Sequence, residues 1–438
     1  MKEIKRDFYL DELISKKNNG LIKVITGIRR CGKSYLLFNL FYRYLISLGI
    51  EEKRIIRFSF DVDEDIDKLD GFFPNDGTKI KEPGKNSFKV NSKKFRAYLK
   101  ALTQEGGQFY ILLDEIQNLD GFVGTLNGLL RNENFDVYVT GSNSRFLSSD
   151  ILTEFRGRGD QVHVYPLSFK EFYDYRGLGF AEAYKEYSYY GGMPLVLNYE
   201  NEQRKAEYLK NLYQEVYLKD LVERNGILDP ENLDRLVKIL SSSIGSYTNA
   251  AKLEGTFKSD LHLSYNHSTI EKHIGYLVDS FLISKATRYD IKGKGYIQAR
   301  YKYYFTDIGL RNAVLNFRQI EPTHIMENII YNELVAGGYN VDIGIVEISE
   351  LNSEKASVRK QLEVDFVVNQ GDERIYIQSV YAMPTLEKAA QEKRSLLRIA
   401  DSFKKVIIVN ENIHAYKTDE GIQILSLEDF LLNKTKLL

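Results

Sequence analysis

The sequence predicts an α/β protein of several domains, the first of which is a doubly wound parallel sheet. Its 438 residues are too many for one ordinary domain. Between Leu21 and about Pro166, apolar runs alternate with helical stretches, and the runs are LIKVITG, RIIRFSF, QFYILLD, FDVYVTG and DQVHVYPL. Strands that are separated by helices favour parallel pairing. Within this region, Gly71 to Asn91 is rich in Gly, Pro, Asn and Lys, and we expect it to form an exposed loop.

The composition restricts the partners and the compartment. Lys plus Arg (60) nearly equals Asp plus Glu (61), so any nucleic-acid surface has to be a local patch. Cys31 is the single cysteine, which excludes an intrachain disulfide and gives no sign of an oxidising compartment. The histidines lack zinc-site spacing, the N-terminus lacks a signal-peptide core, and no apolar run approaches the roughly 18 residues of a membrane span. We expect a cytoplasmic protein without a membrane partner.

A glycine-rich loop after the first predicted strand carries the clearest chemical signal. It fits G-x-x-x-x-G-K-[ST] in full and opens an apolar helix, which is the context that a phosphate-binding loop requires. Backbone N–H groups of such a loop and the helix N-terminus bind phosphate oxygens. The lysine reaches the β- and γ-phosphates, and the serine hydroxyl is a ligand for Mg²⁺. The predicted ATP-binding residues are Gly27, Ile28, Arg29, Arg30, Cys31, Gly32, Lys33, Ser34 and Tyr35. A plain glycine-rich turn is the alternative.

Two carboxylates end the predicted strand FYILLD. Following a phosphate loop, Asp114 is predicted to hold Mg²⁺ and Glu115 to polarise the attacking water. The next predicted strand, Phe135 to Thr140, leads into a polar turn in which Ser142 or Asn143 is a candidate sensor of the γ-phosphate. A polar turn without such a role is an equal alternative.

Several segments together resemble a widespread prokaryotic family of AAA+-type P-loop ATPases that carry a C-terminal domain of unknown function. They are GIRRCGKS, LLDEIQ, VTGSNS, GRGDQVHVYPLSFKEF and YYGGMPLVL, followed in order by RYDIKGKG, KYYFTDIGLRN, EVDFVV and IYIQ. The resemblance covers nearly the whole chain. It implies that Arg156 or Arg158 completes a phosphate site, in cis or from a neighbouring subunit, unless it pairs with a surface acid. Gly192-Met193-Pro194 is similar to the G-x-P element of signalling NTPases, which implies that Pro194 lies against the adenine in a helical lid; a helix-breaking turn is the alternative.

The middle of the chain has the outline of a winged helix. Ser268 to Glu271 fits a capping box, and the following helix has one apolar face. Two strands are then expected around the turn at residues 292–295. This hairpin contains a single acid, Asp290, among the basic residues Lys285, Arg288, Lys292, Lys294, Arg300 and Lys302. A basic wing with tyrosines is suited to a DNA backbone. The alternative is a domain that packs on the ATPase and exposes its lysines to water for solubility, and winged helices in such ATPases often serve as interaction or autoinhibitory modules.

The last part of the chain resembles a restriction-endonuclease-like α/β domain. Asp365 and Glu327 fit its carboxylate positions, but Gln378 and Val380 stand where that fold has a second metal-binding acid and a lysine. A neutral amide is a poor Mg²⁺ ligand and valine cannot orient water, so we expect an inactive nuclease. The predicted domains are therefore an ATPase core (1–166), a helical lid (167–230), a winged helix (231–315) and the endonuclease-like domain (316–438).

These features predict an ATP- and Mg²⁺-dependent ATPase that acts as a nucleotide-driven switch or motor. DNA, bound through the winged helix, and a protein partner are candidate partners, and the sequence leaves the oligomeric state open. An ATP-gated DNA nuclease is one alternative. A regulatory scaffold with idle ATP binding is another.

Overall fold

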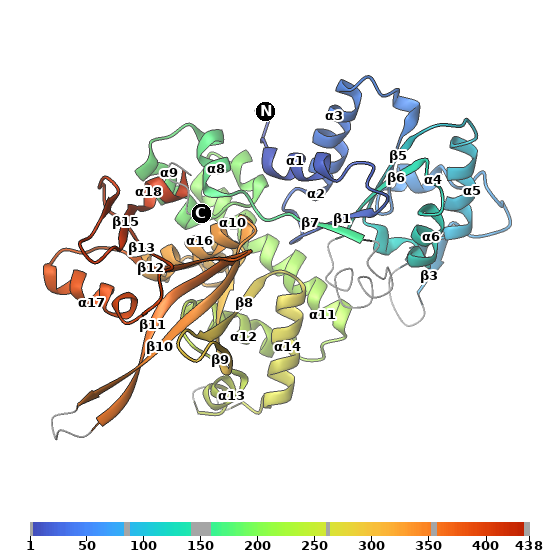
Figure 1. Ribbon diagram of the computed structural model, residues 1–438. Coiled ribbons are helices and arrows are strands. Elements are labelled where there is room, and N and C mark those ends of the chain that lie inside the picture. The colour runs from blue at the N-terminus through green and yellow to red at the C-terminus, as the bar shows by residue number, and fades with distance from the viewer. Residues whose placement is uncertain (1–2, 83–87, 142–158, 260–262, 352–356, 433–438) are drawn as a thin grey trace. The chain divides into compact units, whose positions relative to one another are not determined.

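The computed structural model describes residues 3–82, 88–141, 159–259, 263–351 and 357–432 (Figure 1). The chain divides into two compact units. The N-terminal unit is Ile4–Tyr165, and the C-terminal unit is Pro166–Leu438 together with Met1–Glu3. Within the described residues, no helix is both long enough and apolar enough to cross a lipid bilayer.

The N-terminal unit is built on a five-stranded sheet, and the predicted parallel pairing is confirmed. The order is β2-β5-β6-β1-β7, with every neighbouring pair parallel. All six residues of β5 are buried, as expected for a strand with both faces of its sheet covered. The strands of this sheet are β1 (Ile22–Thr26), β2 (Ile55–Ser59), β5 (Phe109–Asp114), β6 (Phe135–Thr140) and β7 (Gly159–His163).

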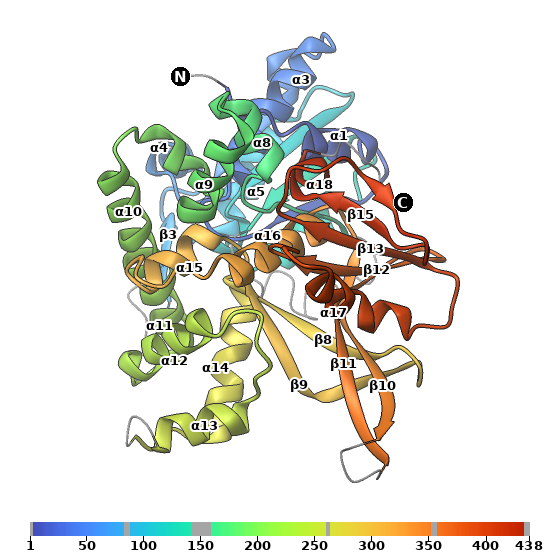
Figure 2. The ribbon, with the colours of Figure 1, turned by 90° about the vertical axis from the view of Figure 1, so that its left-hand side faces the viewer.

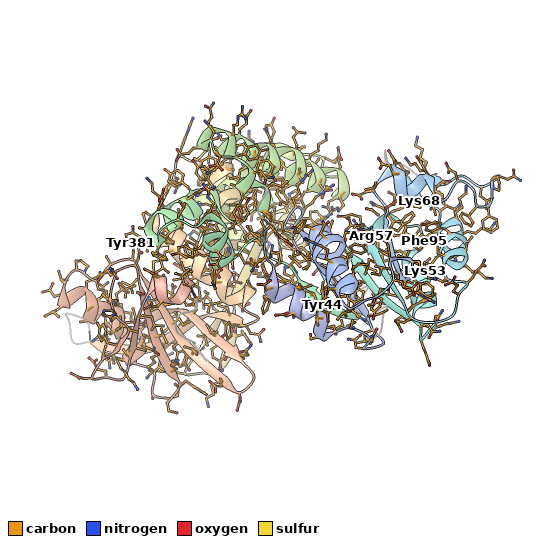
Figure 3. All side chains as sticks on the ribbon, turned by 90° about the horizontal axis from the view of Figure 1, so that it is seen from above. Tyr44, Lys53, Arg57, Lys68, Phe95 and Tyr381 are labelled. Atoms are coloured by element: carbon orange, nitrogen blue, oxygen red, sulfur yellow. The ribbon has the colours of Figure 1, made fainter. Side chains whose placement is uncertain are left out.

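Helices cover this sheet, and one hydrophobic cluster joins three of them to the strands. It contains residues of α4, α5 and α6 together with alternate residues of β1, β2, β5 and β6. At its centre Phe95, labelled in Figure 3, meets Phe58 and Phe60 edge-on with ring centroids 5.1 and 4.9 Å away. The helices of this unit are α1 (Asp7–Ser15), α2 (Lys33–Tyr35), α3 (Tyr42–Ser47), α4 (Asp63–Asp67), α5 (Ser92–Leu102) and α6 (Phe122–Leu129), with the 3-10 turns η2 (Glu52–Arg54) and η3 (Ile116–Asn118) and the π-helical stretch η1 (Leu36–Phe41).

The segment Gly71 to Asn91 is not simply the exposed loop that its composition predicts. It contains a short antiparallel hairpin of β3 (Lys79–Lys81) and β4 (Phe88–Val90). Val90 is fully buried, and its carbonyl oxygen accepts a hydrogen bond from the backbone N–H of Asp120. The sequence pattern did not indicate this hairpin, because the segment is rich in Gly and Pro and only the last residue of its two strands, Val90, is buried.

Helices make up the first half of the C-terminal unit, as the sequence predicts. α15, which follows the hairpin β8–β9 in the chain, packs against α9, α10 and α12, and Figure 2 shows it beside them. The helices of this first half are α8 (Phe169–Arg176), α9 (Phe180–Tyr190), η5 (Pro194–Asn198), α10 (Glu202–Asn211), η6 (Leu212–Leu218), α11 (Lys219–Asn225), α12 (Pro230–Ser242), α13 (Ala250–Ser259) and α14 (His267–Asp279). Later in the chain the unit also contains α15 (Ile308–Val314), α16 (Pro322–Ala336), α17 (Leu386–Leu397) and α18 (Leu427–Leu431).

The predicted capping box at the start of α14 is wrong. The N-cap is Asn266, whose side chain accepts a hydrogen bond from the Thr269 N–H at 2.9 Å. Ser268 lies inside the first turn of the helix. Asn is as good an N-cap as Ser, so the serine motif two residues later was a misleading signal.

An eight-stranded mixed sheet forms the rest of this unit, in the order β14-β15-β13-β12-β11-β10-β8-β9. The hairpin predicted as a wing, β8–β9, is present, but β8 pairs in parallel with β10. Strand pairing therefore crosses the boundary predicted between residues 315 and 316. The strands are β8 (Ile283–Asp290), β9 (Gly295–Phe305), β10 (Asn340–Leu351), β11 (Ser357–Gln370), β12 (Glu373–Val380), β13 (Lys404–Val409), β14 (Tyr416–Lys417) and β15 (Gln423–Ser426).

Two of the sequence motifs lock together in the C-terminal unit. Asp307, the N-cap of α15, is 2% exposed and accepts hydrogen bonds from Leu310 N–H (2.9 Å) and Gly192 N–H (2.7 Å). A Cβ at Gly191 would lie 2.4 Å from the Asp307 carboxylate, and one at Gly309 would lie 2.1 Å from the carbonyl oxygen of Tyr190. The motifs YYGGMP and TDIGLRN therefore need their glycines because two backbones meet there.

Substitution of Asp307 by Asn should loosen this junction. The Asn side chain presents an NH2 group, which cannot accept, to one of the two backbone N–H groups, whereas both oxygens of Asp307 can accept, so we expect a loss of about 1–3 kcal/mol of unfolding free energy. Burial raises the pKa of Asp307 to about 6, and hydrogen bonds from backbone N–H groups offset only part of that rise. A raised carboxyl pKa contributes stability below the unfolded value that disappears as pH increases through the folded value.

The difference between the wild type and Asp307→Asn should therefore be widest near pH 4 and narrow by about pH 7, as measured by urea unfolding. Asp290→Asn is the control, because Asp290 also accepts two backbone N–H bonds but lies in a more exposed turn. A difference that widens with increasing pH would contradict this account of the junction.

Candidate nucleotide site

The glycine-rich loop lies between β1 and α2 and approaches β7 closely. Gly27 has φ of 139°, and a Cβ there would lie 2.0 Å from the carbonyl oxygen of Val164. Gly32 has φ of 101° and is the N-cap of the helix that begins at Lys33. Both glycines are therefore required by the backbone itself. The loop ends on a helix N-terminus, which favours an anion.

The side chains of the loop divide into inward and outward groups. Lys33 is 5% exposed, and its Nζ donates to the carbonyl oxygens of Gly27 and Ile28, each at 3.0 Å. Cys31 is buried, with its Sγ 3.2 Å from the carbonyl oxygen of Val164. Ile28 is also fully buried, whereas the side chains of Arg29, Arg30, Ser34 and Tyr35 reach solvent. The lysine is thus held inside the curve of the loop, where phosphate oxygens would meet it.

An arginine that the sequence did not single out supports the loop from behind. Arg6 is 3% exposed, and its guanidinium donates to the carbonyl oxygens of Cys31 (3.1 Å) and Tyr165 (2.7 Å). It also lies 4.6 Å from the ring centroid of Tyr9. One buried cation therefore ties the N-terminal helix, the loop and the segment after β7 together.

Asp114 lies where the serine of the loop meets the end of β5. Ser34 Oγ donates to Asp114 Oδ1 at 2.9 Å, and Thr140 Oγ1 donates to the same oxygen. Ser59 Oγ is 3.4 Å from Oδ2 and 2.6 Å from Asp61. The structure thus brings together the two predicted Mg²⁺ ligands, which are 80 residues apart in the chain.

The surroundings of Asp114 suit a cation. Burial raises the pKa of Asp114 to about 6, hydrogen bonds from Thr140 and Ser34 lower it, and the charges of Glu115 and Asp61 raise it. Mg²⁺ is bound in nucleotide sites by one or two protein oxygens with substrate phosphates and water. A hydroxyl and a carboxylate in contact fit that requirement. Among the described residues, no three His, Cys, Asp or Glu side chains form a metal cluster of their own.

Glu115 has an unusual backbone conformation that is fixed by its neighbours. Its φ is 51°, and its N–H donates to Thr140 Oγ1 at 3.1 Å. Its carboxylate accepts a hydrogen bond from the side-chain amide of Gln117. Thr140 therefore contacts both acids, although the sequence pattern pointed to the polar turn after it instead. The position of Thr140 as the last residue of β6, directly before that turn, is the sequence feature that indicates it.

Other predicted site residues cannot be placed in this site. Ser142, Asn143, Arg156 and Arg158 lie outside the described residues. Pro194 begins η5 in the C-terminal unit, so its role toward the adenine stays a prediction.

A lysine in the interior of the C-terminal unit meets acids from α16 and β11. Lys302 is 3% exposed, and its Nζ donates to Glu327 at 2.9 Å and to Glu363 at 2.6 Å. Burial alone lowers the pKa of Lys302, but the charges of Glu327, Glu363 and Asp365 outweigh it and raise the pKa above its usual range. Asp365 Oδ2 accepts a bond from the Ser379 N–H at 2.7 Å. The protein's own ammonium group thus compensates these carboxylates.

The same observation corrects the predicted basic wing. Lys302 is used internally, and Arg288 is 8% exposed and donates to Gln361 at 2.8 Å. Neither can face DNA, because a buried charge must keep its internal partners. The exposed basic residues of the hairpin are Lys285, Lys292, Lys294 and Arg300.

Comparison with known proteins gives the class and the family. Residues 19–173 match the model of an AAA domain, and residues 181–321 match a domain of unknown function, DUF8612. An uncharacterized protein of Haemophilus influenzae is 32% identical over 440 residues, which covers 98% of each chain. An uncharacterized protein of Methanocaldococcus jannaschii is 28% identical over 98% of this chain and 88% of its own.

Among solved structures, the Aeropyrum pernix ORC2 protein in ADPNP–ADP complexes is similar with a TM-score of 0.37 and 14% identity, over 75% of this chain and 92% of its own. The fold, the loop and the AAA match define a P-loop protein of the AAA+ type with a C-terminal domain of unknown function. The chain belongs to the same family as the Haemophilus influenzae protein.

Substitution of Thr140 by Val should separate nucleotide binding from turnover. Valine keeps the shape but removes the hydroxyl that contacts both acids, so we expect turnover to fall by roughly 10- to 100-fold while ATP affinity changes little. The measurement is steady-state phosphate release beside the Kd for a fluorescent ATP analogue. Thr125→Val is the control, because Thr125 is buried in the same unit and accepts its bond from Arg96. Equal turnover in both variants would remove Thr140 from the site.

Proposed function

We propose that this protein binds Mg-ATP in its N-terminal unit and hydrolyses it to drive a change in the C-terminal unit. The observation that carries the proposal is the contact between Ser34 and Asp114, with Glu115 next in the chain. Membership of an AAA+-type family supports a nucleotide-driven activity. The two units are then the ATPase domain and the body on which it acts.

Each residue of the site has a distinct task in this proposal. The loop N–H groups and Lys33 bind the β- and γ-phosphates, while Ser34 and Asp114 hold the Mg²⁺, which supplies positive charge against the phosphate oxygens. Glu115 accepts a proton from the attacking water. The water oxygen bonds to the γ-phosphorus as the bond to the bridging oxygen breaks, so that ADP and phosphate leave.

Substitutions of Lys33 and Glu115 should have different effects. Lys33→Ala should weaken Mg-ATP binding by at least about tenfold, because it removes the cation that faces the phosphates. Glu115→Gln should bind ATP normally and reduce turnover by about 100-fold or more. Calorimetry and phosphate release measure the two quantities. Lys53→Ala, which changes an exposed lysine of the same unit (Figure 3), is the control. Unchanged ATP affinity in Lys33→Ala would refute the proposed site.

DNA association is the second part of the proposal, and it is supported by the exposed basic residues of the hairpin β8–β9. The hairpin β8–β9 keeps four exposed basic residues, which could track a phosphate backbone. Double- or single-stranded DNA should then stimulate ATP hydrolysis, with stimulation that fades as salt is added. The double variant Lys294→Ala and Arg300→Ala should lose it, whereas Lys170→Ala with Lys238→Ala should not. A basal rate that is indifferent to DNA would point to a protein partner instead.

The alternative of an ATP-gated nuclease is disfavoured. Gln378 and Val380 occupy β12 where a second acid and a lysine would be needed. Lys302 already compensates Glu327 and Glu363 in the interior. We therefore propose a structural role for this charge cluster.

A further inference from the structure

We infer that Gln117 is a positioning residue for hydrolysis, which orients both the carboxylate of Glu115 and the attacking water. This inference rests on the proposed ATPase function and adds a residue to it. Gln117 lies in the 3-10 turn η3, directly after the strand that ends in Asp114. Its Nε2 donates a hydrogen bond to Glu115 Oε2. The amide therefore constrains the carboxylate that is proposed to take the proton.

The turn that carries Gln117 is held firmly on both sides. Within it, the N–H of Asn118 donates to the carbonyl oxygen of Glu115 at 2.9 Å, and Ile116 is fully buried. From outside, Lys89 Nζ on β4 donates to the carbonyl oxygen of Gln117. The hairpin β3–β4 thus braces the turn that follows Glu115. A braced amide loses little conformational entropy when it orients a partner.

The second polar atom of the amide has no hydrogen-bond partner among the residues that the structure describes. Gln117 Oε1 is buried and makes no hydrogen bond to any described residue. A buried acceptor that lacks a partner costs about 1–3 kcal/mol, so such an atom needs an explanation. A water that gives one hydrogen to Glu115 can give its other hydrogen to an adjacent acceptor. Gln117 Oε1 supplies that acceptor, and the water oxygen is then left with its lone pair toward the γ-phosphorus.

This arrangement needs no new reactant. Glu115 still takes the proton, and the γ-phosphorus still receives the water oxygen. Gln117 neither gains nor loses a proton, since a carboxamide is neutral throughout. Its effect is confined to geometry, which is worth a large factor when an attacking atom must approach in line.

The test compares Gln117→Leu, Gln117→Asn and Asn118→Ala in the full chain. Leucine keeps the volume and removes both polar atoms, so we expect kcat to fall by about 100-fold while the Kd for ATP stays within about threefold. Asparagine is one methylene shorter and should not restore kcat. Asn118 lies in the same turn, and its side chain makes no hydrogen bond in the part of the chain that the structure describes, so Asn118→Ala should keep kcat. Lys89→Ala should give an intermediate loss, because it frees the turn without changing the amide.

The possible results separate this inference from the proposed function. If the wild type hydrolyses ATP and Gln117→Leu retains kcat, or has a higher one, then the inference is wrong and the ATPase function stands. If Gln117→Leu weakens ATP binding and stability as strongly as it lowers kcat, the residue is merely structural and the inference also fails. If the wild type binds ATP without turnover, both the hydrolytic function and this role are refuted. A selective loss of kcat supports both.

Discussion

The N-terminal unit depends on one buried carboxylate, that of Asp114, at the C-terminal edge of its sheet. Hydroxyl groups from the glycine-rich loop, from the end of β6 and from the end of β2 converge on it. Each comes from a different strand connection, so the carboxylate fixes how these connections approach one another. Burial makes the bare negative charge unfavourable, which is why the pKa of Asp114 is raised to about 6. A cation at this point would remove that penalty and keep the hydroxyl groups in place.

The parts of the site that the sequence predicts are the parts that are local in sequence. The glycine-rich loop and the pair Asp114–Glu115 are recognisable because their chemistry needs fixed spacing next to one strand. Thr140 and Arg6 act on residues about 25 positions away, through contacts that only the tertiary fold creates. Gln117 is close in sequence to Glu115, yet its role depends on a turn with a left-handed residue that no periodicity shows. Spacing reveals ligands, whereas packing determines the residues that hold them.

The C-terminal unit shows the same limit at the level of strands and charges. Helix and hairpin were predicted in the correct order, but a pattern of residues cannot say which sheet a hairpin joins, and β8 joins β10. A count of basic residues likewise does not give the surface charge, because Arg288 and Lys302 are buried and donate to internal partners. The segments around Gly191 and Asp307, far apart in the sequence, are brought into close backbone contact by the fold. In each case the sequence pattern does not show which distant segment of the same chain lies next to the motif.

The connection from the nucleotide loop toward the end of the N-terminal unit runs through Arg6. Its guanidinium donates to the carbonyl oxygen of Cys31 in the loop and to that of Tyr165, the last residue of the unit. Cys31 Sγ and the place where a Cβ of Gly27 would lie both meet the carbonyl of Val164, one residue earlier. The loop and the residues that lead to Pro166 therefore share a single set of hydrogen bonds. Because a planar guanidinium keeps its donors in fixed geometry, neither carbonyl can shift far without weakening the bond to the other.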